Sequence, residues 1–319
     1  MKWVVIRLMQ GVLLLVVLSI LVFVFADFAP GDFLAEAELD PRVSQELIEK
    51  LRENYGLEDS LHVRYGRWVA SVFRGEGGYS LAYRRPVLEL MLPRIGHTLI
   101  LATVATLLSW LLALATGILS AYRRGGWIDR SLFLVVVTLL AIPEVLLALG
   151  GLILAVNTDL PLGGATSLDY QTLTWAGQIL DWARHLFIPV GVLTLASVPA
   201  LIRHVRSAVI EALEQPFVAA ARGHGIGGAR LLVGYVMPAA SNPLITLFGF
   251  SFGGLVSGSM LVEEILGWPG MGPLVLDSLM SKDLHVLNTG TVVICLFLLT
   301  GNLVADLLRL LIDPKVRDV

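Results

Sequence analysis

One short pattern in this sequence has the form of a catalytic motif. Gly249-Phe250-Ser251-Phe252-Gly253 matches GxSxG, in which a strained strand-to-helix turn exposes a nucleophilic serine. Here the pattern lies inside a long apolar segment, which favours a helix. Two glycine pairs then have the small-xxx-small spacing that allows helices to approach closely, namely Gly249/Gly253 and Gly254/Gly258. A hydrolase that uses Ser251 and a histidine remains an alternative.

A second candidate for chemistry is the carboxylate of Glu144, which follows Pro143 inside the apolar run Ser131–Val156. A charge at that depth of a membrane costs at least ~2.5–3.5 kcal/mol unless it is paired, protonated or hydrated. Either Glu144 faces a water-filled path and meets a cationic group of a solute, or it pairs with a polar residue of a neighbouring helix. A proton-coupled secondary transporter that uses Glu144 is a further alternative, although no inverted repeat is visible in the sequence.

Other kinds of site lack their sequence signals. No lysine follows the glycine-rich segment of a Walker A motif, so we expect no nucleotide site in this chain. The single cysteine, Cys295, gives neither a disulfide framework nor a metal cluster. His185, His204 and His224 share no metal-ligand spacing. We therefore expect no metal and no cofactor bound by this chain, and if ATP is used, ATP and Mg²⁺ belong to partner subunits.

The composition is that of a membrane protein. Of 319 residues, 56% are hydrophobic and 15% are charged, and the mean hydropathy is +0.78. Soluble domains have about 45–50% apolar and about 25% charged residues. The net charge of −3 suggests no nucleic-acid partner.

Six apolar runs approach the about 20 residues that a helix needs to cross a bilayer. The first could be a signal peptide cleaved after Ala26, but its uncharged core, Leu8–Phe25, is longer than the usual h-region of about 7–15 residues. We therefore expect a retained helix. The six expected spans are Val4–Phe25, Thr98–Ala121, Ser131–Val156, Leu186–Ile202, Ala239–Val262 and Val286–Leu311.

A polar insert, Asp27–Gly96, follows the first span. Asp40-Pro41 has the form of a helix start, with Gly56 as its end. A second helix is predicted from Leu61 to near Gly75 by apolar residues at helical spacing. Short-loop Lys and Arg residues place both termini, loop 122–130 and loop 203–238 in the cytoplasm, with the insert and the acidic Glu263/Glu264 turn outside.

Several motifs resemble one family in sequence and in order. Ala219–Gly225, AAARGHG, precedes Pro238 by thirteen residues from its last glycine, as in the "EAA" loop of ABC-importer permeases, with Ala219 in place of the glutamate. Trp268–Gly272, WPGMG, is similar to the family's WPGxG turn, and Ile312–Arg317 to its C-terminal "DPR" ending. The chain thus resembles the oligopeptide/dipeptide/nickel branch of this family. Ala29–Asp32 and the insert also resemble segments of that branch. Glu144 departs from the branch, in which that position is commonly apolar.

The resemblance implies an all-α membrane protein with six transmembrane helices, a type I importer core and a small helical extracytoplasmic insert. The implied divisions are the first helix (1–26), the insert (27–96), the five-helix core (97–312) and a cytoplasmic tail (313–319). Within the core, a coupling loop spans 207–238 and an extracytoplasmic hairpin spans 263–285.

The resemblance also implies roles for particular residues. Coupling to an ATPase is expected from Phe217, Val218, Ala219, Ala220, Ala221, Arg222, Gly225, Ile226 and Pro238. The expected translocation path contains Pro143, Glu144, Ser251, Gly254 and Ser257. The expected gate or binding-protein docking turn is Trp268, Pro269, Gly270, Met271 and Gly272.

The implied function is that of a transport subunit of the bacterial cytoplasmic (inner) membrane, not an enzyme. It would work by alternating access with a second, similar permease, two ABC ATPase subunits, an extracytoplasmic solute-binding protein and the surrounding membrane lipid. Di- or oligopeptides are the expected solutes, with nickel or another metal chelate and opine-like solutes as alternatives.

Overall fold

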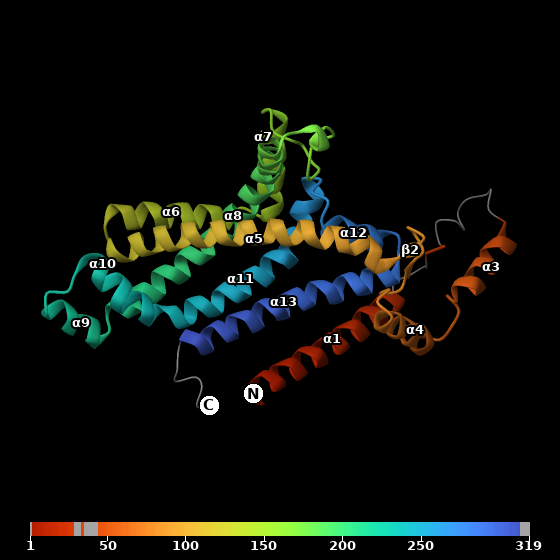
Figure 1. Cartoon of the computed structure of the whole chain (residues 1–319), viewed down its shortest axis with the longest axis horizontal. Helices are drawn as coiled ribbons and strands as arrows, with labels where there is room; N and C mark the ends of the chain where they lie inside the picture. Colours follow the sequence, from red (N-terminus) through yellow and green to blue (C-terminus); the bar gives the residue numbers. More distant parts are fainter. Residues whose placement is uncertain (1, 29–32, 35–43, 313–319) are drawn as a thin grey trace. The chain divides into compact units, whose positions relative to one another are not determined.

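The structure, a computed structural model, describes all residues except 1, 29–32, 35–43 and 313–319. The expected helix start at Asp40-Pro41, the Ala29–Asp32 motif and the tail 313–319 therefore lie outside the described residues. Within the described part, nearly every element is a helix (Figure 1), as the all-α prediction requires. The α-helices are α1 (Lys2–Phe28), α3 (Gln45–Tyr55), α4 (Leu61–Phe73), α5 (Val87–Tyr122), α6 (Trp127–Ala141), α7 (Glu144–Val156), α8 (Trp175–Leu213), α9 (Pro216–Gly223), α10 (Gly228–Leu231), α11 (Met237–Ile265), α12 (Met271–Met280) and α13 (Leu284–Ile312).

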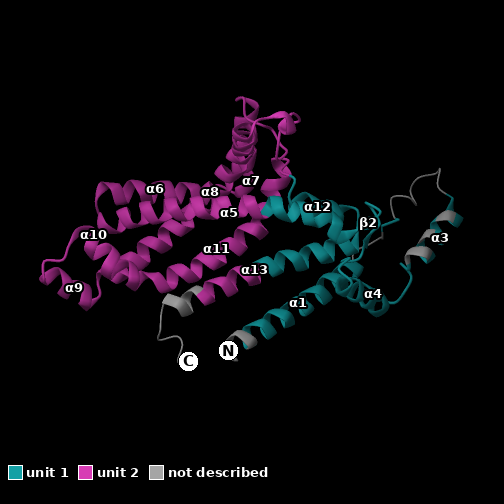
Figure 2. Cartoon of the chain, viewed as in Figure 1, with its two compact units in different colours: residues 1–98, 269–297 teal, residues 99–268, 298–319 magenta. Residues whose placement is uncertain are grey.

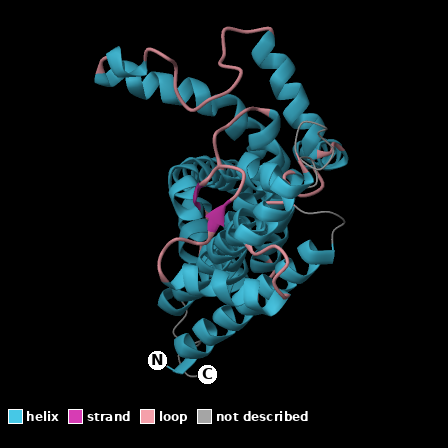
Figure 3. Ribbon diagram, turned by 90° about the vertical axis from the view of Figure 1, so that its right-hand side faces the viewer, coloured by secondary structure: helices cyan, strands magenta, loops and turns pink. Residues whose placement is uncertain are grey.

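The remaining regular elements are short. A 3₁₀ turn, η1, spans Tyr170–Thr172, and a π-helical turn, η2, spans Leu232–Val236 between α10 and α11. Two-residue strands, β1 (Tyr79–Ser80) and β2 (Arg85–Pro86), pair antiparallel, and they are the only strands among the described residues (Figure 3).

Five stretches are long and apolar enough to cross a membrane: the helices α1, α5, α8 and α13, and the stretch α10–η2–α11. The pair α6 and α7 makes a sixth span if it is counted as one. The structure therefore agrees with the prediction of six spans, but several of them are longer than predicted. Helix α5 begins at Val87 rather than Thr98, and α8 begins at Trp175 rather than Leu186.

The expected third span is broken where the sequence carries Ile142-Pro143. Helices α6 and α7 are bent by 95° at this point (Figure 1). The residue before a proline is disfavoured in the helical region, and Ile142 is indeed extended, with φ −89° and ψ 119°. Pro143 then precedes the first turn of α7, and its carbonyl accepts bonds from the backbone N–H groups of Leu146 and Leu147. A single dipeptide thus ends one helix and starts the next.

The chain forms two compact units, coloured separately in Figure 2: residues 1–98 with 269–297, and residues 99–268 with 298–319. In unit 1, an aromatic cluster of Phe23, Tyr65 and Trp68 joins α1 to α4. The Trp68 indole donates to the hydroxyl of Thr289 on α13 (2.9 Å), and that hydroxyl donates to the carbonyl of Gly77 (2.6 Å). These buried bonds fix helix α4 of the insert to the start of α13.

Further polar contacts in unit 1 join the insert to the segment after α11. Ser80 donates to the buried carboxylate of Asp283 (2.7 Å). The Tyr83 hydroxyl donates to the Asp277 carboxylate. Burial and then this hydrogen bond raise the pKa of Tyr83, so the phenol keeps its proton throughout the physiological range.

In unit 2, α8 is the central helix and packs against α6, α7 and α11. Many of its side chains are buried, and the core cluster around it includes Val205, Val209 and Leu244. Helix α5 reaches α8 at Gly117, where an added Cβ would lie 2.8 Å from side-chain atoms of Val205. The absence of a side chain at Gly117 therefore sets the distance between these two helices.

A partly buried ion pair joins α6 to α8. The Arg206 guanidinium donates to both carboxylate oxygens of Asp129, at 2.8 and 2.9 Å. Asp129 also accepts bonds from the Ser120 hydroxyl (2.5 Å) and the Gly125 backbone N–H (2.9 Å), and it is 7% exposed. Four hydrogen bonds to one carboxylate therefore hold the ends of α5, α6 and α8 together.

Replacing Asp129 by Asn should destabilise the protein by about 2 kcal/mol, because Arg206 keeps its charge but loses its anionic partner. The matched control is Glu214→Gln, which breaks an exposed ion pair with Arg124 (2.7 Å) and should cost less than about 0.5 kcal/mol. Thermal unfolding of the detergent-purified chain compares the two variants. Equal melting temperatures would show that the Asp129 bonds contribute nothing.

Candidate functional site

The short helix α9 lies in unit 2, between the end of α8 and α10. Pro216 occupies its first position, where the missing N–H costs no hydrogen bond. Its other end is a Schellman motif. The backbone N–H of Ile226 donates to the carbonyl of Ala221 (3.0 Å), and the backbone N–H of Gly225 donates to the carbonyl of Arg222 (2.9 Å). Gly225 takes the left-handed conformation that this motif needs, with φ +78°. The boundaries of α9 are therefore set by its own sequence.

The side chains of α9 point in two directions. Val218 (0% exposed) and Ala221 are buried in the core cluster of unit 2 together with Ala212. Phe217, however, is 48% exposed. The residues Ala219, Ala220, Arg222 and Gly225 are also exposed, while Ile226 packs against the core cluster. The helix thus has a buried base and an outward side on which Phe217 is the one large apolar side chain.

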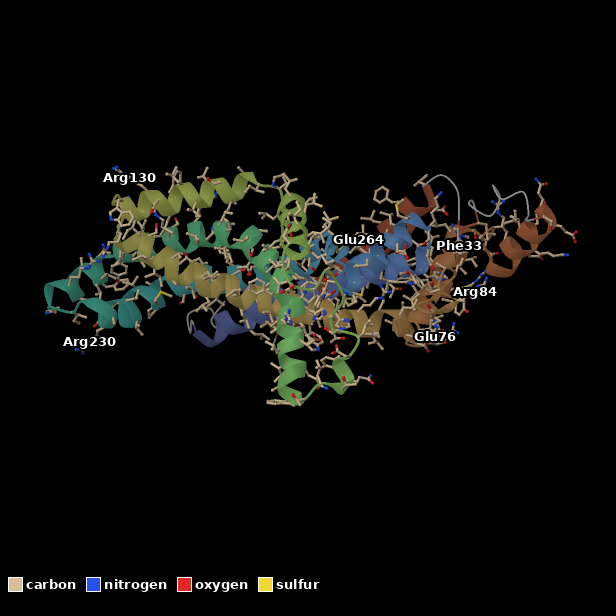
Figure 4. The ribbon with its side chains drawn as sticks, turned by 90° about the horizontal axis from the view of Figure 1, so that it is seen from above. Phe33, Glu76, Arg84, Arg130, Arg230 and Glu264 are labelled. Atoms are coloured by element: carbon tan, nitrogen blue, oxygen red, sulfur yellow. The ribbon has the colours of Figure 1, made fainter. Side chains whose placement is uncertain are left out.

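Pro238 is exposed but lies outside α9. It lies at the start of α11, directly after η2, where a proline is tolerated. The segment around α9 is rich in exposed basic side chains, including Arg222 and Arg230. Figure 4 shows Arg130 and Arg230 at the same end of unit 2, whereas Glu264 lies far from that end. Unit 2 therefore has a basic end that carries α9.

Helix α11 has two glycine faces with different surroundings. An added Cβ at Gly249 would lie 2.2 Å from the Cβ of Ala305, and one at Gly253 would lie 2.6 Å from Leu298. This pair therefore allows α11 to pack closely against α13. At Gly254 and Gly258 an added Cβ would meet nothing within 4 Å. Among the residues that the structure describes, only the first of the two predicted pairs packs against another helix, and the second forms an open face.

The open face of α11 also carries the exposed side chain of Ser257, so the structure brings two of the expected path residues, Gly254 and Ser257, together. Ser251 has a different environment. Its hydroxyl accepts a bond from the Trp110 indole (2.7 Å) and donates to the carbonyl of Phe248 (2.8 Å). The bond from Trp110 connects α5 to α11 and gives Ser251 a role in helix packing.

The backbone around Ser251 does not form a nucleophile elbow. Residues Met237–Ile265 form one continuous helix, so the GxSxG pattern lies in the middle of α11. A nucleophile elbow needs a strand before the serine and a sharp turn at it. Neither is present at Ser251.

Glu144 is the first residue of α7, at the 95° break. Its side chain is half-buried and makes no hydrogen bond or ion pair with any described residue. The expected alternative of a structural partner on a neighbouring helix is therefore not met within the described part of the chain. Pro143, its neighbour, is exposed.

The WPGMG turn is mostly buried. In unit 2, Trp268 is 1% exposed, packs edge-to-face on Trp182, and donates its backbone N–H to the carbonyl of Glu263 (2.8 Å). In unit 1, the backbone N–H of Met271, which is also 1% exposed, donates to Thr98 (2.8 Å), and Gly270 and Gly272 are buried. Trp268 and Met271 therefore anchor the turn, and Pro269 is its more accessible residue.

Sequence reasoning did not find the Asp129–Arg206 pair. The loops that contain the two residues, 122–130 and 203–238, contributed to the prediction only through the basic residues that set the orientation. The available signal was an acid and a base at the ends of two predicted spans, but sequence spacing alone does not show that two helices are neighbours.

A glycine-to-alanine substitution should have opposite effects on folding at the two glycine faces of α11. Gly249→Ala should reduce the yield of folded protein severalfold, because the new methyl group collides with Ala305 and with the backbone of Gly301. Gly254→Ala should be neutral or stabilising, since alanine is favoured over glycine inside a helix by roughly 0.5–1 kcal/mol. Fluorescence-detected size-exclusion chromatography measures both variants. Losses of similar size would contradict the assignment of the two faces.

Comparison with known proteins agrees with this architecture. The family described as "Binding-protein-dependent transport system inner membrane component" matches residues 113–318, and its N-terminal companion family matches residues 1–102. Among solved structures, the inward-facing MetNI methionine ABC transporter matches 72% of this chain and 98% of its own, with a TM-score of 0.58 and 18% identity. That likeness concerns the fold.

Curated relatives cover almost the whole chain. It is 34% identical over 311 residues to the oligopeptide transport system permease protein AppB of Bacillus subtilis, covering 97% of each chain. It is 32% identical to the probable D,D-dipeptide transport system permease protein DdpB of Escherichia coli, covering 96% of this chain and 94% of that one. It is 30% identical to the glutathione transport system permease protein GsiC of Salmonella paratyphi A, covering 98% and 97%. The chain therefore belongs to the family of inner membrane components of binding-protein-dependent transport systems.

Proposed function

We propose that this chain is the permease subunit of an ATP-driven, binding-protein-dependent peptide importer. The observation that carries the proposal is α9, a helix with a buried base and an exposed Phe217 at the basic end of unit 2. The relatives support peptides as the solute, since their names refer to oligopeptides, D,D-dipeptides and glutathione. They favour peptides over the alternatives of a metal chelate or an opine.

Residues of α9 would transmit force between this chain and an ATPase subunit. A membrane subunit that lacks a nucleotide site needs a firm contact with its motor, and the burial of Val218 and Ala221 fixes α9 to the core. Phe217 would insert into the motor subunit as an aromatic anchor, the kind of residue that often dominates interface energetics. Gly225 contributes by ending the helix, so its role in coupling is indirect.

The complete transporter would contain two ATPase subunits, a second permease and an extracytoplasmic solute-binding protein. In this arrangement α9 and both termini lie in the cytoplasm, and the insert and the WPGMG turn lie outside. The position of Arg130 and Arg230 at one end of unit 2 supports this orientation, because basic residues favour the cytoplasmic side. Closure of the motors on ATP would move α9 and shift the permease toward its outward-open state, to the extent that ATP binds that state more tightly.

The open face of α11 is our candidate for the wall of the translocation path. Gly254 and Gly258 leave room for a solute, and Ser257 offers a hydroxyl to peptide groups. Glu144, with no partner among the described residues, would meet the ammonium group of a peptide. The buried Trp268 and Met271 would hold the gate turn in place rather than touch the binding protein themselves.

Phe217→Asp tests the coupling role. The exposed position should accept the change without loss of folding, whereas ATP-dependent peptide uptake should fall more than about tenfold because an interface anchor is lost. Proteoliposomes that contain the complete transporter allow ATP hydrolysis and uptake to be measured together. Val218→Asp is the contrasting variant, and it should reduce folded yield because it buries a charge. Normal uptake by a folded Phe217→Asp transporter would argue against docking at α9.

Glu144→Gln tests the solute contact. Removal of the charge should weaken transport of a peptide with a free amino terminus about tenfold, because a charged hydrogen bond contributes roughly 1.5–3 kcal/mol. The N-acetylated form of the same peptide serves as the control and should be transported equally by both proteins. If uptake of both peptides falls in step with folded yield, Glu144 has only a structural role.

A further inference from the structure

A cavity of about 800 Å³ in unit 2 lies between α6 and α8 and has no part in the proposed transport cycle. Its lining comes from the first turns of α6, the last turns of α8 and Ser120 of α5. Arg130, Arg203 and Arg206 contribute positive charge, and Phe133 and Ile202 contribute apolar surface. The cavity therefore combines a cationic part with an apolar part.

The positive charge of the cavity is only partly neutralised. Asp129 holds Arg206 through two hydrogen bonds, so that pair is close to neutral. Arg130 and Arg203 are exposed, and neither guanidinium group makes a hydrogen bond or ion pair with another described residue. The cavity thus presents two arginines that are available to an anion. A guanidinium group suits phosphate well, because its planar N–H groups can donate two bonds to the phosphate oxygens.

The apolar part follows the basic part along α6. Phe133, one turn beyond Arg130, is 61% exposed, and Leu134 beside it is 65% exposed. A rise of about 1.5 Å per residue places these side chains roughly 5 Å further along the helix. Both α6 and α8 belong to candidate membrane spans. Basic side chains with an apolar surface one helical turn further along the span suit a molecule with an anionic head and a hydrocarbon tail.

We propose that this cavity binds an anionic phospholipid. Arg130 and Arg203 hold its phosphodiester group, and an acyl chain lies along Phe133 and the neighbouring apolar side chains of α6. Basic pockets between membrane helices are suited to such headgroups. A soluble phosphate would leave the apolar wall uncovered, and a lipid covers it. The proposal requires the chain to be embedded in a membrane, and it does not depend on which solute is transported.

The first test compares lipid retention by the full-length, detergent-purified chain in native mass spectrometry. Phosphatidylglycerol and phosphatidylcholine with identical acyl chains are titrated in parallel. We expect preferential retention of one phosphatidylglycerol molecule. The double variant Arg130→Gln/Arg203→Gln should lose most of this preference, by a factor of about five for each arginine removed.

The matched control is Arg123→Gln/Arg230→Gln, which removes the same charge from two exposed arginines outside the cavity. This variant should keep the wild-type preference. Equal losses in the two double variants would mean that the lipid is attracted by overall charge, and no preference in the wild type would mean that there is no site. Either result overturns the proposal.

Two further measurements separate the lipid from other occupants. Inorganic phosphate at millimolar concentration should not displace phosphatidylglycerol, and Phe133→Gln should weaken retention although it changes no charge. Displacement by phosphate alone, or full retention by Phe133→Gln, would assign the cavity to a soluble anion instead. If the complete transporter shows no preference while the isolated chain does, the surface is a contact between subunits and the proposal fails.

Discussion

Helices inside a bilayer gain little by hiding apolar side chains from lipid, so close backbone approach and a few polar bonds must hold them together. Unit 2 of this protein is built in that way. Gly117 allows α5 to reach α8, and Gly249 and Gly253 allow α11 to reach α13. Asp129 and Arg206 connect α6 to α8, and the Trp110–Ser251 bond connects α5 to α11. The functional surfaces proposed above depend on this framework, since α9 and the open face of α11 are attached to it.

The framework also explains how neighbouring residues with the same character perform different tasks. Val218 is buried beneath α9 while Phe217 points outward, so one apolar pair both anchors the helix and exposes a contact. The space beside Gly253 is occupied by α13, whereas Gly254, one residue later, faces open space. In each pair the helical rotation of about 100° per residue separates a structural position from an accessible one. A permease thus needs only small differences in sequence to carry both kinds of surface.

Much of this could be predicted from sequence. The apolar runs predicted the spans, because hydrocarbon thickness fixes their length. The break of the third span at Pro143 was not predicted, although proline restricts the residue before it. The early start of α8 at Trp175 was missed, since polar residues such as Asp181 and Arg184 interrupt the apolar pattern. Their partners, Ser167 and the carbonyl of Asp159, become visible only in three dimensions. The burial of Trp268 was missed for the same reason, because the Trp182 ring that covers it lies 86 positions earlier in the sequence.

The break between α6 and α7 has a consequence for hydration. The last carbonyl groups of α6 and the first N–H groups of α7 lack helical partners, as at every helix end, but here they lie partway along a candidate span. Hydrocarbon cannot satisfy such groups, and irregular backbone is tolerated at that depth only beside protein or water. Ile142 and Pro143 therefore make it costly to surround this part of the bundle with lipid tails alone, and they favour wetting of the membrane interior at the point where Glu144 begins the next helix.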